Sequence, residues 1–353
     1  MSRLFQPLQQ RGVTLKNRIV VSPMCQYSAT DGLPDDWHLV HLGSRAVGGA
    51  AVVFTEACAV SAEGRISPQD AGIWNDAQRD AWARIASFIA ARGAIPAMQL
   101  AHAGRKASSH APWRGHGEVA VGEGGWPTLA PSALAYDETY PLPRMLDAVG
   151  IAKVVDDFRV AAGRARVAGF RIAEIHAAHG YLLHQFLSPL SNRREDDYGG
   201  SFGNRVRLVL DVIGAVRAVW PDDLPLWLRV SASDWIDGGW DIEQSVELSR
   251  RASALGVDLV DTSSGGLAPQ QQLGIGPGYQ VPFAAHIRRH AGIATGTVGL
   301  ITEPEQAERI LANGEADVVL LAREFLRDPY FARTAAKALG AAQQTPEQYL
   351  RAW

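Results

Sequence analysis

Two histidines and a tyrosine within six residues are the first sign of chemistry in the sequence. His176, His179 and Tyr181 follow the run 170–175, an apolar segment typical of a buried strand. Imidazole and phenol groups donate hydrogen bonds, so three of them at one strand end can bind an electronegative atom of a substrate. The spacing therefore predicts a site at the end of this strand.

The same His-x-x-His pair is compatible with zinc, because neutral imidazoles are zinc ligands. A zinc site needs a third ligand from another strand end, such as Glu56 or His102, and nothing at metal-site spacing accompanies the pair. We expect no metal. A metal-dependent barrel hydrolase using His176 and His179 stays open as an alternative.

Composition limits the class of partner. The 353 residues are 47% hydrophobic and 20% charged, as in a globular protein, and the formal net charge is only -3. No Lys/Arg-rich block is present, which argues against nucleic acid or an anionic membrane as partner and favours a small molecule. The sequence has no apolar stretch resembling a signal peptide or a membrane span, so a cytoplasmic location is expected. Two cysteines, Cys25 and Cys58, cannot form a four-cysteine zinc or iron–sulfur site.

Strand-like and helix-like segments alternate eight times. Near-continuously apolar strands that alternate with helices predict a parallel sheet closed on itself, a (β/α)8 barrel. We expect one domain over 1–353, with a loop excursion at 103–149 and a C-terminal tail at 340–353. A doubly wound sheet is less favoured, because no G-x-G-x-x-G follows the first strand. The expected strands are 18–24, 51–60, 95–102, 170–176, 226–232, 257–263, 293–298 and 316–322, and the expected helices are 37–47, 76–91, 151–168, 201–220, 242–255, 282–290, 304–313 and 329–339.

The last three strands end in small residues. These ends are 263–266, 298–300 and 322–323, and the last of them includes Arg323. Small residues let backbone N–H groups approach an anion, and the loops after strands seven and eight are the usual phosphate site of a barrel. A phosphate-bearing cofactor is therefore implied, although glycines serving only as turns would give the same pattern.

At these strand ends the chain resembles the old yellow enzyme family of flavin mononucleotide (FMN) ene-reductases, over nearly its full length. Cys25, Ala57 and the ending 348–353 are similar to the bacterial branch that contains the xenobiotic reductases and the thermophilic-like ene-reductases. The matching motifs are 17–19, 23–27, 99–106, 174–182, 192–201, 204–205, 299 and 322–323.

The resemblance implies an enzyme that carries FMN and is reduced by NADPH or NADH. Gln99 and Arg229 would contact the flavin ring, with Arg229 placing positive charge where reduced flavin carries negative charge. One pocket would serve both substrates in turn, which accounts for the missing dinucleotide motif. The positions that match flavin-binding residues of the family are Pro23, Met24, Cys25, Ala57, Gln99, Arg229, Gly265, Gly266, Gly299, Leu300, Ala322 and Arg323.

The resemblance also implies roles on the substrate side. His176 and His179 would hold a carbonyl or nitro oxygen, and Tyr181 would donate a proton to the substrate, unless it is a core tyrosine with a satisfied hydroxyl. Cys25 would tune the flavin and touch substrate, unless it is simply a small buried hydrophobe. Tyr27 would hydrogen-bond substrate from one wall.

Other matched positions are less specific. Arg351 matches an arginine that reaches the neighbouring subunit's site, which implies a homodimer or homotetramer, although an arginine so near a chain end is usually solvated. Trp113 and Trp126 would cap the pocket. His184 has no matched role and is expected to be structural or exposed. A barrel that binds flavin or ligand without turnover is a third hypothesis.

Overall fold

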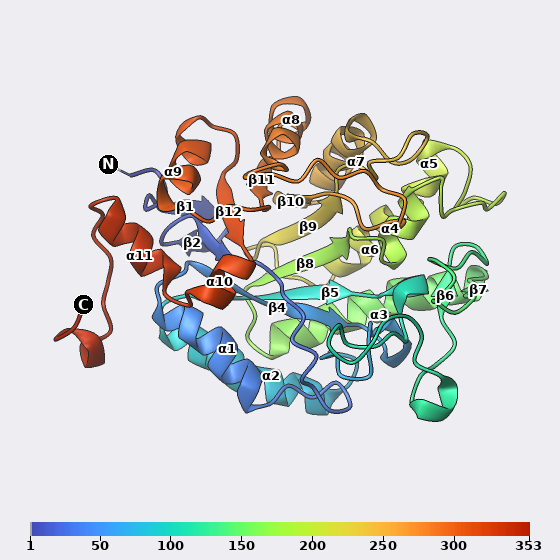
Figure 1. Cartoon of the computed structure of the whole chain (residues 1–353), viewed down its shortest axis with the longest axis horizontal. Helices are drawn as coiled ribbons and strands as arrows, with labels where there is room; N and C mark the ends of the chain where they lie inside the picture. Colours follow the sequence, from blue (N-terminus) through green and yellow to red (C-terminus); the bar gives the residue numbers. More distant parts are fainter. Residues whose placement is uncertain (1) are drawn as a thin grey trace.

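Eight parallel strands close into a barrel in a computed structural model that describes residues 2–353 (Figure 1). Neighbouring strands follow chain order, and β12 pairs with β3 to complete the ring. The predicted (β/α)8 barrel is confirmed. The barrel strands are β3 (Ile19–Val21), β4 (Val52–Ala59), β5 (Ile95–Ala101), β8 (Ile172–Ala177), β9 (Leu226–Ser231), β10 (Leu259–Ser263), β11 (Ala294–Thr297) and β12 (Val318–Leu321).

Helices form the outer layer around the strands (Figure 1). Several of them begin at an acceptor side chain that caps free backbone N–H groups, as at Asp35, Asn75, Asp147 and Asp241. The apolar stripe of each helix then packs on the strands. The main outer helices are α1 (Asp36–Val47), α2 (Asp76–Ala91), α3 (Ala148–Val167), α6 (Arg207–Arg217), α7 (Ile242–Ala254), α8 (Val281–Ala291), α9 (Pro304–Ala312) and α11 (Phe331–Ala338).

Some element boundaries differ from the sequence prediction. The helix expected over 201–220 is two helices, α5 (Phe202–Arg205) and α6, and the last strands are shorter than expected. Two further short helices, α4 (Leu182–Leu187) and α10 (Arg323–Arg327), were not anticipated, because short helices held by tertiary contacts leave little periodicity in a sequence.

The turn-rich N-terminus contains a hairpin, β1 (Leu8–Gln10) with β2 (Val13–Leu15). Its Gln10 side chain is 7% exposed and accepts a hydrogen bond of 2.7 Å from the Trp227 indole of β9. This contact satisfies a polar group that would otherwise be buried alone, and it joins the hairpin to the barrel.

The excursion after β5 is held against the rest of the chain. It contains β6 (Leu129–Ala130) and β7 (Arg144–Met145), and α3 starts at Ala148, slightly before the expected helix. The Arg194 guanidinium donates to the carbonyls of Pro131 (3.0 Å) and Leu146 (2.6 Å). These bonds give the excursion a defined path. Within residues 2–353, no helix combines the length and apolarity that a membrane crossing requires.

Candidate active site

His176, His179 and Tyr181 lie together where β8 ends. His176 belongs to β8, His179 lies in the following turn, and Tyr181 precedes α4. The ring centroids of His176 and His179 are 5.1 Å apart, and those of His176 and Tyr181 are 5.2 Å apart, both pairs edge to face. The structure therefore brings the three candidate substrate-binding side chains into one cluster.

The turn at His179 and Gly180 is unusual, because both residues have positive φ angles, +58° and +73°. For histidine this conformation costs free energy, so the surroundings must stabilise it. All four backbone polar groups of the two residues bond to side chains. Ser231 Oγ accepts from His179 N (2.9 Å), Lys106 Nζ donates to His179 O (2.9 Å), His184 Nδ1 accepts from Gly180 N (2.9 Å), and Gln185 Nε2 donates to Gly180 O (2.7 Å).

His184 was expected to be either structural or exposed. It is fully buried, so its role is structural. Its Nδ1 accepts from Gly180, so the proton of the neutral ring is on Nε2, which lies 2.9 Å from Asp234 Oδ1. Burial alone would raise the pKa of Asp234, but His184 and the hydroxyl of Ser188 lower it below its usual value. Asp234 is therefore ionised and fixes the ring that supports the turn.

Both candidate substrate-binding histidines are neutral near pH 7. Burial, and secondly the positive charge of Arg229, hold the pKa of His176 and of His179 well below the usual range. His176 Nδ1 accepts from the Ala178 N–H (3.3 Å), so its proton is on Nε2. His179 Nε2 lies 2.7 Å from Ser263 Oγ. Each neutral ring retains one N–H group for donation.

Lys106 connects the turn to its surroundings. Its amino group donates to the carbonyls of His179 (2.9 Å) and Gly266 (3.0 Å), and lies 5.2 Å from the Tyr181 ring centroid. Burial, with the nearby charge of Arg105, lowers the pKa of Lys106 to about 8. The residue is mostly protonated at neutral pH and places a cation beside the cluster.

The residues expected at the flavin ring come from strands β3, β4, β5 and β9. Pro23 and Met24 follow β3, Ala57 lies beside Gln99 in the register of β4 and β5, and Arg229 lies on β9. Gln99 and Arg229 are 1% and 5% exposed. Gln99 and Arg229 are therefore buried within the barrel.

Cys25 and Tyr27 follow on the same segment after β3. Burial raises the pKa of the Cys25 thiol well above its ordinary value and also raises the pKa of Tyr27, so both groups are protonated. Tyr27 has a φ of +50°, and its ring meets the edge of Trp113 in the excursion, with centroids 5.5 Å apart. Trp126, also expected to cap the pocket, donates its indole N–H to the Glu63 carbonyl at 2.9 Å.

The predicted phosphate-binding residues separate into two groups. Gly299, Leu300, Ala322 and Arg323 line a cavity of about 150 Å³ between the ends of β11 and β12. Gly299 has a φ of +123°, and a Cβ there would lie 2.8 Å from the ring of Tyr279, so only glycine fits. An arginine beside small residues at this end of a barrel suits an anionic phosphate.

The other group, Gly265 and Gly266, does not line this cavity. Both residues have positive φ angles, and a Cβ on Gly266 would come within 2.6 Å of His179 Cα. Gly266 therefore allows close packing against the histidine turn. The structure gives these glycines a place beside the substrate-binding cluster, whereas the sequence grouped them with the phosphate site.

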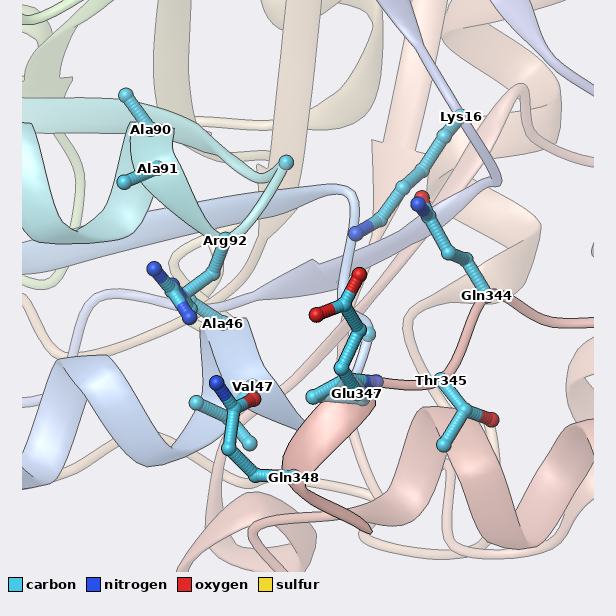
Figure 2. Close-up of a pocket in the computed structure, with 13 residues that line it drawn as sticks. Lys16, Ala46, Val47, Ala90, Ala91, Arg92, Gln344, Thr345, Glu347 and Gln348 are labelled. Carbon is cyan, nitrogen blue, oxygen red and sulfur yellow. The ribbon is translucent and has the colours of Figure 1, made fainter. Parts of the chain in front are cut away.

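A larger cavity of about 520 Å³ lies elsewhere (Figure 2). It is bounded by the ends of α1 and α2 and by tail residues 344–348, and the Lys16 amino group and Glu347 carboxylate point into it. Lys16 and Gly93 precede strands, so this cavity is at the amino-terminal end of the barrel. Barrel active sites form at the opposite end, and the lining contains no predicted site residue.

Several residues of the site were not singled out from the sequence. Ser231, Gln185 and Asp234 support the histidine turn, and Lys106 was noticed only as part of a motif. A side chain that supports a turn through a contact with a distant segment leaves no recognisable pattern in the sequence around it. Across residues 2–353, no three His, Cys, Asp or Glu side chains gather as a metal site would require, so the zinc alternative lacks its third ligand.

The arginine-lined cavity after the last strands suits a phosphate-bearing cofactor, and the neutral hydrogen-bond donors after β8 suit an electronegative atom of a substrate. The family model described as NADH:flavin oxidoreductase / NADH oxidase matches residues 3–341. An NADPH dehydrogenase of Listeria monocytogenes is 51% identical over 100% of both chains, and one of Geobacillus thermodenitrificans is 48% identical over 99% of this chain and 98% of its own.

Solved structures with a similar fold include a reductase and an old yellow enzyme homologue. Morphinone reductase is 29% identical, with a TM-score of 0.80, over 98% of this chain and 92% of its own. An old yellow enzyme homologue from Zymomonas mobilis is 27% identical, with a TM-score of 0.78, over 97% and 94%. The chain belongs to the NADH:flavin oxidoreductase / NADH oxidase family, that is, the old yellow enzyme family. It is an FMN-dependent oxidoreductase that uses NAD(P)H, which confirms the predicted class and cofactors.

Proposed function

We propose that the protein is an ene-reductase that reduces the activated C=C bond of α,β-unsaturated carbonyl compounds, with nitro compounds as a second substrate class. The observation that carries this proposal is the pair of neutral imidazoles at the end of β8, 5.1 Å apart and beside a tyrosine. Two N–H donors directed at one oxygen withdraw electrons from a conjugated double bond.

The chain's own groups then bind and polarise the substrate. His176 and His179 hold the carbonyl or nitro oxygen, which makes the β-carbon electrophilic. FMN, when bound, supplies the hydride that it has received from NAD(P)H. Burial raises the pKa of Tyr181 well above its ordinary value, so the phenol keeps its proton until the α-carbon accepts it. Hydride at the β-carbon and a proton at the α-carbon together complete the reduction.

Other side chains hold the cofactor and shape the pocket. Gln99 and Arg229 would contact the flavin ring when FMN is bound, and Arg229 would stabilise the negative charge of the reduced form. Arg323 and the backbone at Gly299 bind the phosphate, since they line the cavity after β11 and β12. The Cys25 thiol, which is protonated, borders the flavin and substrate.

Ala57 and Tyr27 complete the walls of the same pocket. Ala57 is 5% exposed and lies in register with Gln99, so its methyl group would border a flavin ring that Gln99 contacts. Tyr27 binds substrate from the side of the excursion, where Trp113 supports its ring.

The C-terminal tail serves a second copy of the chain. Arg351 is exposed, on a tail whose residues 344–348 border the amino-terminal end of the barrel, opposite to its own site. Trp353 packs on Tyr330, with centroids 5.1 Å apart, and under the Arg333 guanidinium, which lies 4.6 Å from its ring. A homodimer or homotetramer in which Arg351 reaches the neighbouring site accounts for this position.

The purified protein tests the proposal directly. We expect a yellow protein that bleaches anaerobically with NADPH and regains colour on addition of cyclohexenone. The variants His176→Ala and His179→Ala should still bleach with NADPH but reoxidise slowly with the enone. A colourless, zinc-dependent hydrolase would contradict the proposal, and bleaching with no reoxidation by any enone or nitro compound would favour ligand binding without turnover.

A further inference from the structure

The two polar side chains assigned to the flavin ring, Gln99 and Arg229, each have a buried carboxyl group beside them on the next strand. Gln99 on β5 is in register with Glu174 on β8, and Arg229 on β9 is in register with Asp261 on β10. Residues in register on neighbouring parallel strands project from the same face of the sheet. Glu174 and Asp261 are therefore the strand neighbours of the two proposed flavin contacts.

The contacts within these pairs are direct. Gln99 Nε2 donates to Glu174 Oε1 at 2.7 Å, and Arg229 Nε lies 3.1 Å from Asp261 Oδ2. Arg229 also donates to Ser22 Oγ at 3.2 Å. Both acids are fully buried, at 0% exposure. The orientation of Gln99 and the position of the Arg229 guanidinium thus depend on carboxyl groups that solvent does not reach.

Charge balance limits the ionisation of the two acids. One cation, Arg229, faces two carboxyl groups, and a buried unpaired anion is costly in free energy. Neither Asp261 oxygen nor Glu174 Oε2 has a hydrogen-bond partner among the described residues, but Asp261 Oδ2 lies 3.1 Å from Nε of the Arg229 cation. Burial, and secondly the charge of Asp261, raise the pKa of Glu174 well above its usual value. Burial also raises the pKa of Asp261, but Arg229 opposes that rise.

We propose that Asp261 is the ionised partner of Arg229 and that Glu174 is a neutral carboxylic acid, so that this pair sets the charge presented to the flavin. This inference rests on the proposed contacts of Gln99 and Arg229 with the flavin ring. Asp261 offsets part of the positive charge of Arg229 and thereby limits the stabilisation of reduced, anionic FMN. Glu174 holds Gln99 in place without adding a second negative charge.

Two isosteric variants test the assignment on the flavin-bound protein. Asp261→Asn removes a negative charge, so reduced FMN should bind more tightly relative to oxidised FMN, by about tenfold, which corresponds to a rise of about 30 mV in the two-electron potential. Glu174→Gln replaces one neutral group with another and should leave the potential unchanged. Infrared spectra of the wild type at neutral pH should show a protonated carboxyl band that Glu174→Gln lacks.

Other results would overturn the assignment. They are an unchanged potential in Asp261→Asn with FMN bound, a rise in Glu174→Gln as large as that expected for Asp261→Asn, or an infrared band that survives in Glu174→Gln. Should Asp261→Asn fail to fold or to bind FMN, the infrared comparison and the potential of Glu174→Gln still decide the state of Glu174. Failure of the proposed function is distinguishable, because wild-type protein would then turn over no enone or nitro compound, whatever its flavin potential.

Discussion

Lys106→Met is the most informative single change at the histidine turn. The variant keeps a long side chain but removes the amino group, which donates to the carbonyls of His179 at 2.9 Å and Gly266 at 3.0 Å. A hydrogen bond to a charged group contributes about 1.5–3 kcal/mol, and a carbonyl left without a partner carries a desolvation cost of its own. The turn should therefore lose its defined position while the barrel stays folded.

If about 2 kcal/mol of that loss appears in the transition state, kcat/KM for an enone falls about 30-fold. FMN affinity should not change, because Lys106 lies at the histidine turn and does not line the cavity of Gly299 and Arg323. The assay is anaerobic stopped flow, which separates flavin reduction by NADPH from reoxidation by the enone. Binding of the enone and reoxidation of the flavin by the enone should slow in proportion to the weakened turn.

A matched control is Lys153→Met. Lys153 is exposed and pairs with Glu63 (2.9 Å) and Asp157 (2.7 Å) on the surface, so its removal should leave every rate unchanged. A Lys106→Met enzyme that retains FMN and reoxidises within about twofold of the wild-type rate, well below the loss worked out above, would refute the view that this amino group holds the turn.

Four further predictions concern the same site and the tail. His184→Leu should lower the free energy of unfolding by about 2–3 kcal/mol in urea titrations, because it removes the acceptor of Gly180 N and the ring nitrogen beside the buried Asp234 carboxylate. The pKa of Asp234 in the folded protein is lowered, so its ionisation stabilises the fold fully above the unfolded pKa of this carboxyl group. This stabilisation is lost as the pH falls through the lower, folded pKa. Measuring the free energy of unfolding at a series of acidic pH values would reveal the loss. Lys106 loses its charge as pH rises through about 8, so kcat/KM should decline there, and Lys106→Arg should move this decline to higher pH; an unchanged profile would count against the role of the charge. Deleting residues 348–353 should weaken substrate affinity and change the flavin spectrum, and no change in either would exclude a role for Arg351 in a neighbouring site.

The supports of the histidine turn show why part of the site escaped prediction. Lys106 and Ser231 are 73 and 52 residues from His179 along the chain. Neither a lysine after a loop nor a serine at a strand end signals such a contact by its type or spacing. A signal did exist for Glu174 and Asp261, because an acid within an otherwise apolar strand must be neutral or paired when buried.

Local sequence patterns determined the barrel and the positions where strand-end chemistry could occur. Apolar runs bounded by turn residues mark the strands, and the polar groups that follow them, such as His176 and His179, must lie at one end of a parallel barrel. These features depend only on neighbours along the chain. They can therefore be predicted from the sequence alone.

Only the tertiary structure decided which side chains meet and in which ionic state. Gln99 meets Glu174 across 75 residues, and Arg229 meets Asp261 because β9 and β10 pair in one register among several that their apolar patterns would allow. Burial then lowers the pKa of the two histidines and raises that of Glu174. Both effects arise when closure of the barrel excludes water, which no single stretch of sequence can express.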